Sequence, residues 1–276
     1  MPINYLEKIQ LGDFSEEGYR VNPSKVVESV VEGFYVFSRD QKQDTHLIFN
    51  DGFPVLVFLP EADDTVSVLA ENKTFEIKGG WASAGAIKNV YIKYNASINQ
   101  VYIVRFYPGS FYPLFGLDAH HFKHKPIVPF ESIAKCSDFS MSSFFKCNTI
   151  EKKTAFLEEY IYTTFSAHCT PEALHQTLDY IHKIKGQSTV RNVTNDIGVN
   201  YKWLERSFAQ HIGFMPKVYI QLQRFIHAYL ELVRDEEVDL MRIALSNGYY
   251  DSNHFLKDFK GYTGKTPLEY LRFQTS

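Results

Sequence analysis

Three histidines in one short segment form the pattern closest to a metal site. His120, His121 and His124 carry imidazoles, which are good ligands for zinc or copper. Lys123 and Lys125 stand beside them, and their ammonium groups would repel a cation. The segment is therefore predicted to be a polar connector, and no metal is expected there.

The cysteines and the known catalytic motifs give no better candidate for chemistry. Cys136 and Cys147 have no histidine pair at zinc spacing, and Cys169 makes the number odd, which is typical of reduced thiols in a cytoplasm. The sequence holds no glycine-rich phosphate loop, nucleophile elbow or His-Glu-x-x-His motif. His46 is the only histidine before residue 120, so a metal-ligand set on adjacent strands is not apparent. We expect neither an enzyme nor a cofactor.

The strongest pattern is an internal repeat with an offset of 51 residues. Both copies read Phe-x-x-x-x-Gly-x-x-Pro-x-x-Tyr. The first copy consists of Phe208, Gly213, Pro216 and Tyr219, and the second of Phe259, Gly264, Pro267 and Tyr270. Glycine is typical of the left-handed residue after a helix, and proline of the first position of the next helix. The repeat therefore predicts two copies of one helical unit.

The residues before the first copy predict a helix-turn-helix. A helix over Val190–Ile197 ends at Gly198, and Asn200 can cap a second helix over Tyr201–Ile212. Two helices joined by a short turn that contains glycine form such a unit. A long helix over Lys217–Val233 then leads to the second copy.

The second unit repeats this arrangement. Leu240–Asn247 is predicted to be a helix that ends at Gly248, and Asp251 or Ser252 can cap a helix that runs to Thr263. A single match of this kind is weak, because any helical hairpin can imitate it. Two copies joined by one long helix are much more specific.

Residues 171–272 resemble the DNA-binding region of the AraC/XylS-type transcriptional regulators. The resemblance rests on Trp203 to Phe208 and Ile212 to Pro216 in the first unit, and on Ile243-Ala244, Gly248 to Phe255 and Gly264 to Arg272 in the second. Thr194 departs from the alanine that the family usually has at the helix crossing, and Asn200 from the usual serine cap. The resemblance implies a transcription factor with tandem helix-turn-helix units.

A recognition helix points polar side chains into the major groove while its other face holds the core. Arg206 can donate two hydrogen bonds to guanine and Glu205 can accept from cytosine, whereas Asn253 suits adenine and Leu256 a thymine methyl. The resemblance places the family's base-reading positions on the same residues. The predicted DNA-binding residues are Lys202, Glu205, Arg206, Ser252, Asn253, His254, Leu256 and Lys257.

The first 130 residues have the period of strands. Thr45–Phe49 and Val55–Leu59 flank a turn, Val66–Leu69 and Thr74–Lys78 are predicted to form a hairpin, and Val101–Tyr107 is apolar on both faces and therefore central. Regular short strands predict a β-sandwich or barrel, which we describe as cupin-like. The segment also resembles, more faintly, the β-rich sensor-like domains that precede the DNA-binding region in such regulators. This resemblance rests on Asn50-Asp51-Gly52, Val104 to Gly109 and Phe115-Gly116.

The expected fold is therefore an α+β chain of two domains. Residues 1–130 form a β-rich sensor or dimerisation domain, residues 131–169 a helical connector, and residues 170–276 an all-α DNA-binding domain. The helix over Thr154–Phe165 has two apolar stripes and is a candidate for dimerisation. The aromatic residues of the first domain fill its core or line a pocket for an apolar or aromatic effector.

Charge and hydropathy limit the partners. The chain has 276 residues and a formal net charge of −3, but residues 171–276 hold 13 basic and 12 acidic side chains and are almost neutral. DNA binding must therefore depend on where charges lie rather than on their number. No apolar run reaches the length of a membrane span, and the N-terminus does not read as a signal peptide. We expect a cytoplasmic protein.

The leading hypothesis is a sequence-specific, DNA-binding transcriptional regulator with a small-molecule effector as a candidate ligand. Double-stranded DNA is the expected partner. A homodimer is expected because a nearly neutral DNA-binding domain should bind weakly alone. The alternative is a cupin-like enzyme or metal-binding protein with a helical appendage.

Overall fold

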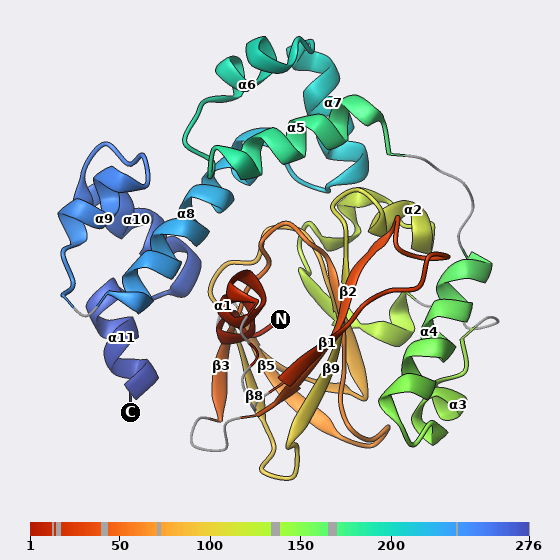
Figure 1. The fold of residues 1–276 in the computed structure, drawn as a ribbon. Helices are drawn as coiled ribbons and strands as arrows, with labels where there is room; N and C mark the ends of the chain where they lie inside the picture. Colours follow the sequence, from red (N-terminus) through yellow and green to blue (C-terminus); the bar gives the residue numbers. More distant parts are fainter. Residues whose placement is uncertain are drawn as a thin grey trace.

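The computed structural model shows a β body from the N-terminal half and a helical body from the C-terminal half (Figure 1). It describes residues 1–12, 14, 18–39, 44–70, 73–133, 139–164, 170–235 and 237–275. Cys136, Cys169 and Phe165 lie outside the described residues. The expected two-part α+β architecture is confirmed.

Two antiparallel sheets face each other in the β body. The six-stranded sheet has the order β1 (Gly18–Val21), β2 (Val31–Ser38), β9 (Gln100–Phe106), β4 (Val55–Phe58), β7 (Gly80–Ser83) and β10 (Ile127–Pro129). The four-stranded sheet has the order β3 (Thr45–Ile48), β8 (Val90–Tyr94), β5 (Thr65–Ala70) and β6 (Lys73–Lys78). The sheets do not close on each other, so the body is a sandwich rather than a barrel.

The interior strand β9 explains how the sandwich is filled. It pairs with β2 on one side and β4 on the other, which confirms the prediction of a central strand. Val101 and Ile103 belong to the core between the sheets, while Tyr102, Val104 and Phe106 belong to a second core on the outer face. Side chains of successive residues point to opposite faces, so a strand apolar throughout must be covered on both sides.

Short helices build the outer core of the six-stranded sheet. They are α2 (Phe111–Phe115), η2 (Ala119–Phe122), η3 (Phe130–Ser132), α3 (Met141–Lys146) and α4 (Ile150–Thr164). Leu157, Tyr160 and Ile161 of α4 are buried in this core, and Phe156 packs against it. Much of both apolar stripes that made this helix a dimerisation candidate is thus used within the chain. An additional helix, α1 (Ile3–Leu11), packs against the core between the sheets, where Tyr5 stacks on Phe37.

The helical body contains both predicted units. The first consists of α5 (Glu172–Lys183), α6 (Val190–Ile197) and α7 (Tyr201–His211), and α8 (Pro216–Arg234) leads to α9 (Leu240–Ser246), α10 (Ser252–Thr263) and α11 (Pro267–Thr275). Gly198, Gly213 and Gly264 have φ values of 76°, 84° and 74°. These left-handed angles explain why glycine recurs at the ends of the helices.

The two bodies share an apolar interface. The Phe49 ring lies 5.4 Å from that of Phe225 in α8 and 5.8 Å from that of Tyr262 in α10. The backbone N–H of Asn89 donates to the carbonyl of Tyr262 at 2.7 Å, and the Tyr91 hydroxyl donates to that of Thr263 at 2.5 Å. The helical body is therefore packed on the sandwich rather than tethered to it.

Candidate DNA-binding interface

The first candidate recognition helix is α7. The Asn200 side chain accepts hydrogen bonds from the backbone N–H groups of Lys202 and Trp203, which confirms the predicted cap. Leu204 and Phe208 are fully buried on its inner side. This packing fixes which face of α7 is left for a ligand.

The polar residues of α7 lie away from that core. Lys202 and Arg206 are exposed, and Glu205 is partly exposed. The Tyr201 hydroxyl hydrogen-bonds Glu205, and the partnership raises the pKa of Tyr201. Trp203 is partly buried against the core of the first unit, in agreement with a packing role.

The second candidate recognition helix is α10. Asp251, not Ser252, caps it by accepting the backbone N–H of His254 at 2.7 Å. Phe255 and Phe259 are buried on its inner side, so the helix is oriented in the same way as α7. The shared cap chemistry and core spacing follow from the sequence repeat.

Asn253 and Lys257 of α10 are exposed, and Ser252 and Leu256 are partly exposed. His254 is partly buried, and its ring packs edge-on against that of Tyr249 at 5.2 Å. Each predicted DNA-binding residue therefore lies on one of the two candidate helices, and His254 also has a packing role. Whether any of them contacts a base stays a prediction.

Two departures from the usual family pattern are accommodated. Thr194 is 7% exposed at the crossing of α6, and its hydroxyl donates to the carbonyl of Arg191 at 2.8 Å. The extra polar atom is thus satisfied within its own helix. Asn200 serves as a cap as serine would, because its side-chain oxygen accepts the same backbone donors.

Outward residues beyond the predicted set also belong to this surface. Gln210 is exposed and Ala209 is partly exposed one turn after Arg206, and Tyr250 just before α10 is 88% exposed. The helical period of α7 would have identified the first two, since they continue its outward face. Tyr250 stands in a turn, where period gives no signal.

A buried ion pair in the sandwich positions α8. The Arg105 guanidinium donates to both carboxylate oxygens of Asp51 at 2.8 and 2.7 Å, and both residues are 2% exposed. The backbone carbonyl of Asp51 accepts from Gln223 of α8 at 2.6 Å. The Cβ site of Gly52 faces the ring of Tyr219 at 2.5 Å, and φ of Gly52 is 97°, so a side chain cannot be placed there.

His182 and His227 lie in the helical body near the Asp51–Arg105 pair, where burial disfavours the charged imidazolium. Burial lowers the pKa of His182, whose ring stacks against Phe53 and hydrogen-bonds the Tyr219 hydroxyl at 2.6 Å. Burial, together with nearby Lys185, lowers the pKa of His227 from 6.5 to about 4. Both are therefore neutral in the folded chain near pH 7.

Acidification should weaken the fold through these histidines. In the unfolded chain these histidines take up protons near pH 6.5, whereas folded His227 does so near pH 4. Protonation therefore favours the unfolded chain as the pH falls from 6.5 toward 4. The free energy of unfolding is not reduced by these groups above pH 6.5 and decreases through that range. Urea unfolding at a series of pH values should show a shallower acid loss for His227→Gln than for the wild type. His120→Gln, at a side chain 66% exposed, should keep the wild-type slope. Equal slopes for all three proteins would contradict this assignment.

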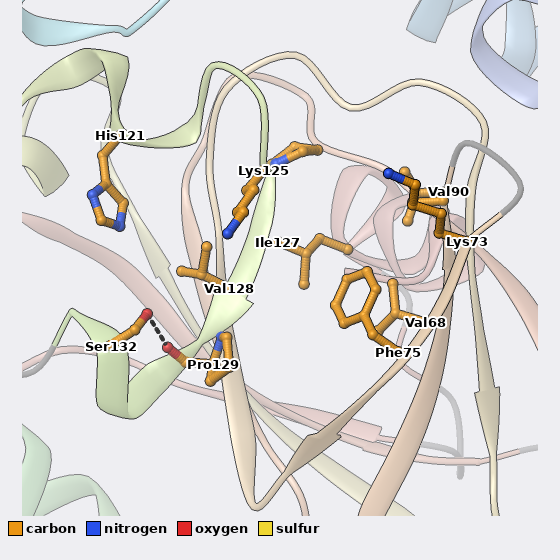
Figure 2. A pocket seen from close by; sticks show the side chains of 12 residues that line it. Val68, Lys73, Phe75, Val90, His121, Lys125, Ile127, Val128, Pro129 and Ser132 are labelled. Atoms are coloured by element: carbon orange, nitrogen blue, oxygen red, sulfur yellow. Dashed lines mark hydrogen bonds between the residues drawn. The ribbon is translucent and has the colours of Figure 1, made fainter.

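A cavity of about 600 Å³ opens between the two sheets, where β6 and β10 do not pair (Figure 2). Its walls are apolar and include Val68, Phe75, Val90, Ile127 and Val128. Lys73, Lys125 and His121 add cationic or titratable groups to the lining, and the side chain of Lys125 lies between His121 and Ile127 in the view of Figure 2. The sequence had not indicated this cavity, because its walls come from separate strands.

The histidine segment does not form a cluster of ligands. His120 Nδ1 lies 2.9 Å from Asp118, whereas His121 lines the sandwich cavity. Over the described ranges, no three side chains of His, Cys, Asp or Glu come together as a metal-binding group. Cys147 is a partly buried free thiol. None of the helices in the described part of the chain is long and apolar enough to cross a membrane.

Comparison with known families gives two matches. Residues 193–272 match the family described as "Helix-turn-helix domain", which includes α7 and α10. Residues 19–127, which form most of the sandwich, match "Domain of unknown function (DUF6597)". An uncharacterized helix-turn-helix-type transcriptional regulator of Staphylococcus aureus is 27% identical over 100 residues, which are 36% of this chain and 13% of that protein. The match thus spans about an eighth of that relative's length.

Three solved structures are also similar. ToxT from Vibrio cholerae aligns over 93% of this chain and 97% of its own, with 13% identity and a TM-score of 0.46. ToxT of strain SCE256 with a bound unsaturated fatty acid aligns over 92% of this chain and 93% of its own, with 10% identity and a TM-score of 0.42. The AraC-like transcriptional activator CuxR aligns over 72% and 74%, with 14% identity and a TM-score of 0.24.

The chain carries two helix-turn-helix units behind a β-sandwich. The repeat, the capped helices and the family match agree on the type of unit. Residues 193–272 therefore form a helix-turn-helix domain of the matched family.

Proposed function

We propose that the chain reads a specific DNA sequence with α7 and α10 and regulates transcription from that site. The observation that carries the proposal is the pair of capped helices, each with a buried apolar side and an outward polar side, in a matched helix-turn-helix domain. Such helices insert their polar side into the major groove. A regulator of this kind works where the DNA lies, so we place the protein in the cytoplasm.

Selection of bound fragments from random DNA tests this function directly. The purified chain should enrich one sequence, and binding to it should weaken as salt rises because phosphate contacts release counterions. A random-sequence fragment of equal length is the control. Enrichment of no sequence, or equal binding to both fragments, would contradict the proposed function.

The spacing of the two units gives a second expectation. If α8 holds both recognition helices on one side of the DNA, they occupy successive turns of the major groove, roughly 34 Å apart. Footprinting of the fully engaged protein should then show two protected segments about 10 base pairs apart on an asymmetric site. Protected segments on opposite faces of the duplex would contradict this arrangement.

We also infer that two chains pair on adjacent half-sites. The helical half is nearly neutral, so its unspecific attraction to DNA is small, and pairing would raise affinity through effective concentration. Light scattering should show a dimer at micromolar concentration, on DNA if not in its absence. Monomers under both conditions would exclude this part of the proposal.

The sandwich cavity is the proposed site of a small-molecule effector. Its volume suits a ligand, and its apolar walls with lysines beside them suit an apolar body with an anionic group. The dye 8-anilinonaphthalene-1-sulfonate has both features and should fluoresce on binding to the wild type. Val68→Trp, which fills the cavity from β5, should remove the signal, whereas Leu69→Trp on the outer face of β5 should keep it. Equal signals from both variants would place the dye elsewhere.

A further inference from the structure

The outward face of α7 is not open to solvent along its whole length. A groove of about 350 Å³ separates it from the segment that leads into η2. The groove is lined by Leu117, Asp118, His120, Arg206, Ala209 and Gln210. In Figure 1 the α2 region of the β body lies beneath the first unit, which agrees with this placement.

η2 lies close to the outward face of α7. A duplex that α7 enters must place its major groove, about 12 Å wide, around this helix. Arg206 and Ala209 point to the side of α7 opposite Leu204 and Phe208, which is the side that must enter the major groove. DNA bound by α7 would have to share this side of the helix with η2.

The equivalent face of α10 is open. Asn253, Lys257, Lys260 and Gly261 follow one another along it, and all four are exposed. An added Cβ at Gly261 would meet no atom within 4 Å. The two units are related by the sequence repeat, but in this conformation the outward face of α7 shares a groove with Leu117, Asp118 and His120, and the outward residues of α10 are exposed.

The short helix η2 also lines the sandwich cavity. His120 lines the groove against α7, while the next residue, His121, lines the cavity. Phe122 anchors the turn, since it is 2% exposed and packs edge-on against Phe111 and Tyr112. A short helix held at one end, with one side on α7 and the other on the cavity, can transmit a change from one to the other.

We propose that η2 masks the first recognition helix and that the contents of the sandwich cavity set the position of this mask. In the conformation described, the chain binds DNA through α10 alone. Movement of η2 toward the cavity uncovers α7 and adds the second contact. The inference rests on the proposed DNA-binding function and specifies how that function is regulated.

Footprinting with Asp118→Arg tests the mask. The substitution removes the carboxylate that caps η2 and places a second cation in the groove that Arg206 lines, so η2 and α7 should separate. On an operator selected with this variant, hydroxyl-radical footprints should show two protected segments for Asp118→Arg and one for the wild type at equal occupancy. Asp63→Arg makes the same charge change on the remote β4–β5 loop, at a side chain 91% exposed, and should keep the wild-type footprint.

The outcomes separate the mask from the function beneath it. One protected segment for every protein, or two for the wild type, would overturn the mask while leaving DNA binding intact. No protected segment for any protein would instead refute the proposed function. Two segments for Asp63→Arg would show that added charge, not release of α7, produced the change.

A second substitution reports on the masked side chain itself. Arg206→Ala should change the affinity of the wild type less than twofold, because α7 is not engaged. In the Asp118→Arg background the same substitution should lower the affinity at least about fivefold, as for a lost base contact. Equal effects in the two backgrounds would overturn the mask.

His121→Trp tests the link to the cavity. The indole is larger and more apolar than imidazole, so it should enter the cavity and draw η2 with it, away from α7. The footprint should then extend to two segments without any ligand. His124→Trp, three residues away and not part of the cavity lining, should leave one segment. Identical footprints for both tryptophan variants would overturn the coupling.

Discussion

Replacing Asp51 by alanine should lower the free energy of unfolding by about 3–5 kcal/mol. The carboxylate is 2% exposed and accepts two hydrogen bonds from Arg105, whose guanidinium is equally buried. Removal of one partner leaves the other charge in the interior without its main compensation. Glu32 still faces Arg105 Nε at 3.2 Å, which moves the expected loss toward the lower end of the range.

Urea unfolding followed by far-UV circular dichroism and by tryptophan fluorescence measures this loss. Trp81 lies in the sandwich and Trp203 in α7, so a dichroism and a fluorescence transition that coincide report the whole chain. Asp63→Ala removes an exposed carboxylate paired with Lys78 and should change stability by less than about 1 kcal/mol. A similarly small change for Asp51→Ala would contradict the importance of the buried pair.

The paired substitution Asp51→Leu with Arg105→Met separates charge from shape. If the loss in Asp51→Ala comes from an uncompensated charge, the double variant should be more stable than Asp51→Ala. If the double variant is less stable than Asp51→Ala, the lost stability comes from packing and from the position of the Asp51 carbonyl that Gln223 contacts. Either result says how the sandwich holds α8.

Replacing Asn253 by alanine should remove about 1–3 kcal/mol of discrimination at one base pair of the operator. Asn253 is exposed in the first turn of α10, on the reading face that no other part of the described chain covers. An asparagine amide can make two hydrogen bonds with adenine, and alanine can make none. The dissociation constants for the operator and its single-base variants, at one salt concentration, give the discrimination.

Lys260→Ala is the matched control on the same helix. Lys260 is exposed and suits a phosphate contact, so its loss should weaken binding to all sequences alike and reduce the salt slope by about 0.9. Loss of affinity by an equal factor on every sequence for Asn253→Ala would make it a backbone contact rather than a base reader. Because α10 is not covered, neither result depends on the position of η2.

The two candidate recognition helices could be predicted from the sequence because their signals are local. Helix ends need glycine with a left-handed backbone, starts need a cap such as Asn200 or Asp251, and one buried stripe needs apolar residues at helical spacing. Each signal spans less than about 15 residues. Repetition of the signals at an offset of 51 residues then identified the pair of units.

Long-range pairing in the sandwich could not be predicted in the same way. Thr45–Ile48 and Val55–Phe58 are strands as expected, yet β3 and β4 belong to different sheets, and β1, β2 and β7 had not been identified. Alternation of side chains predicts a strand but does not name its partner. The Asp51–Arg105 pair and the cavity between β6 and β10 depend on that partnership.

The sequence by itself determined that this chain carries two helix-turn-helix units and which side chains those units present. Tertiary structure alone decided that η2 lies beside the outward face of α7. Asp118 and Arg206 are 88 residues apart, and no local pattern relates them. They line the same groove because α8 packs on the sandwich through Phe49, Phe225 and Gln223, and this packing carries the first unit to η2.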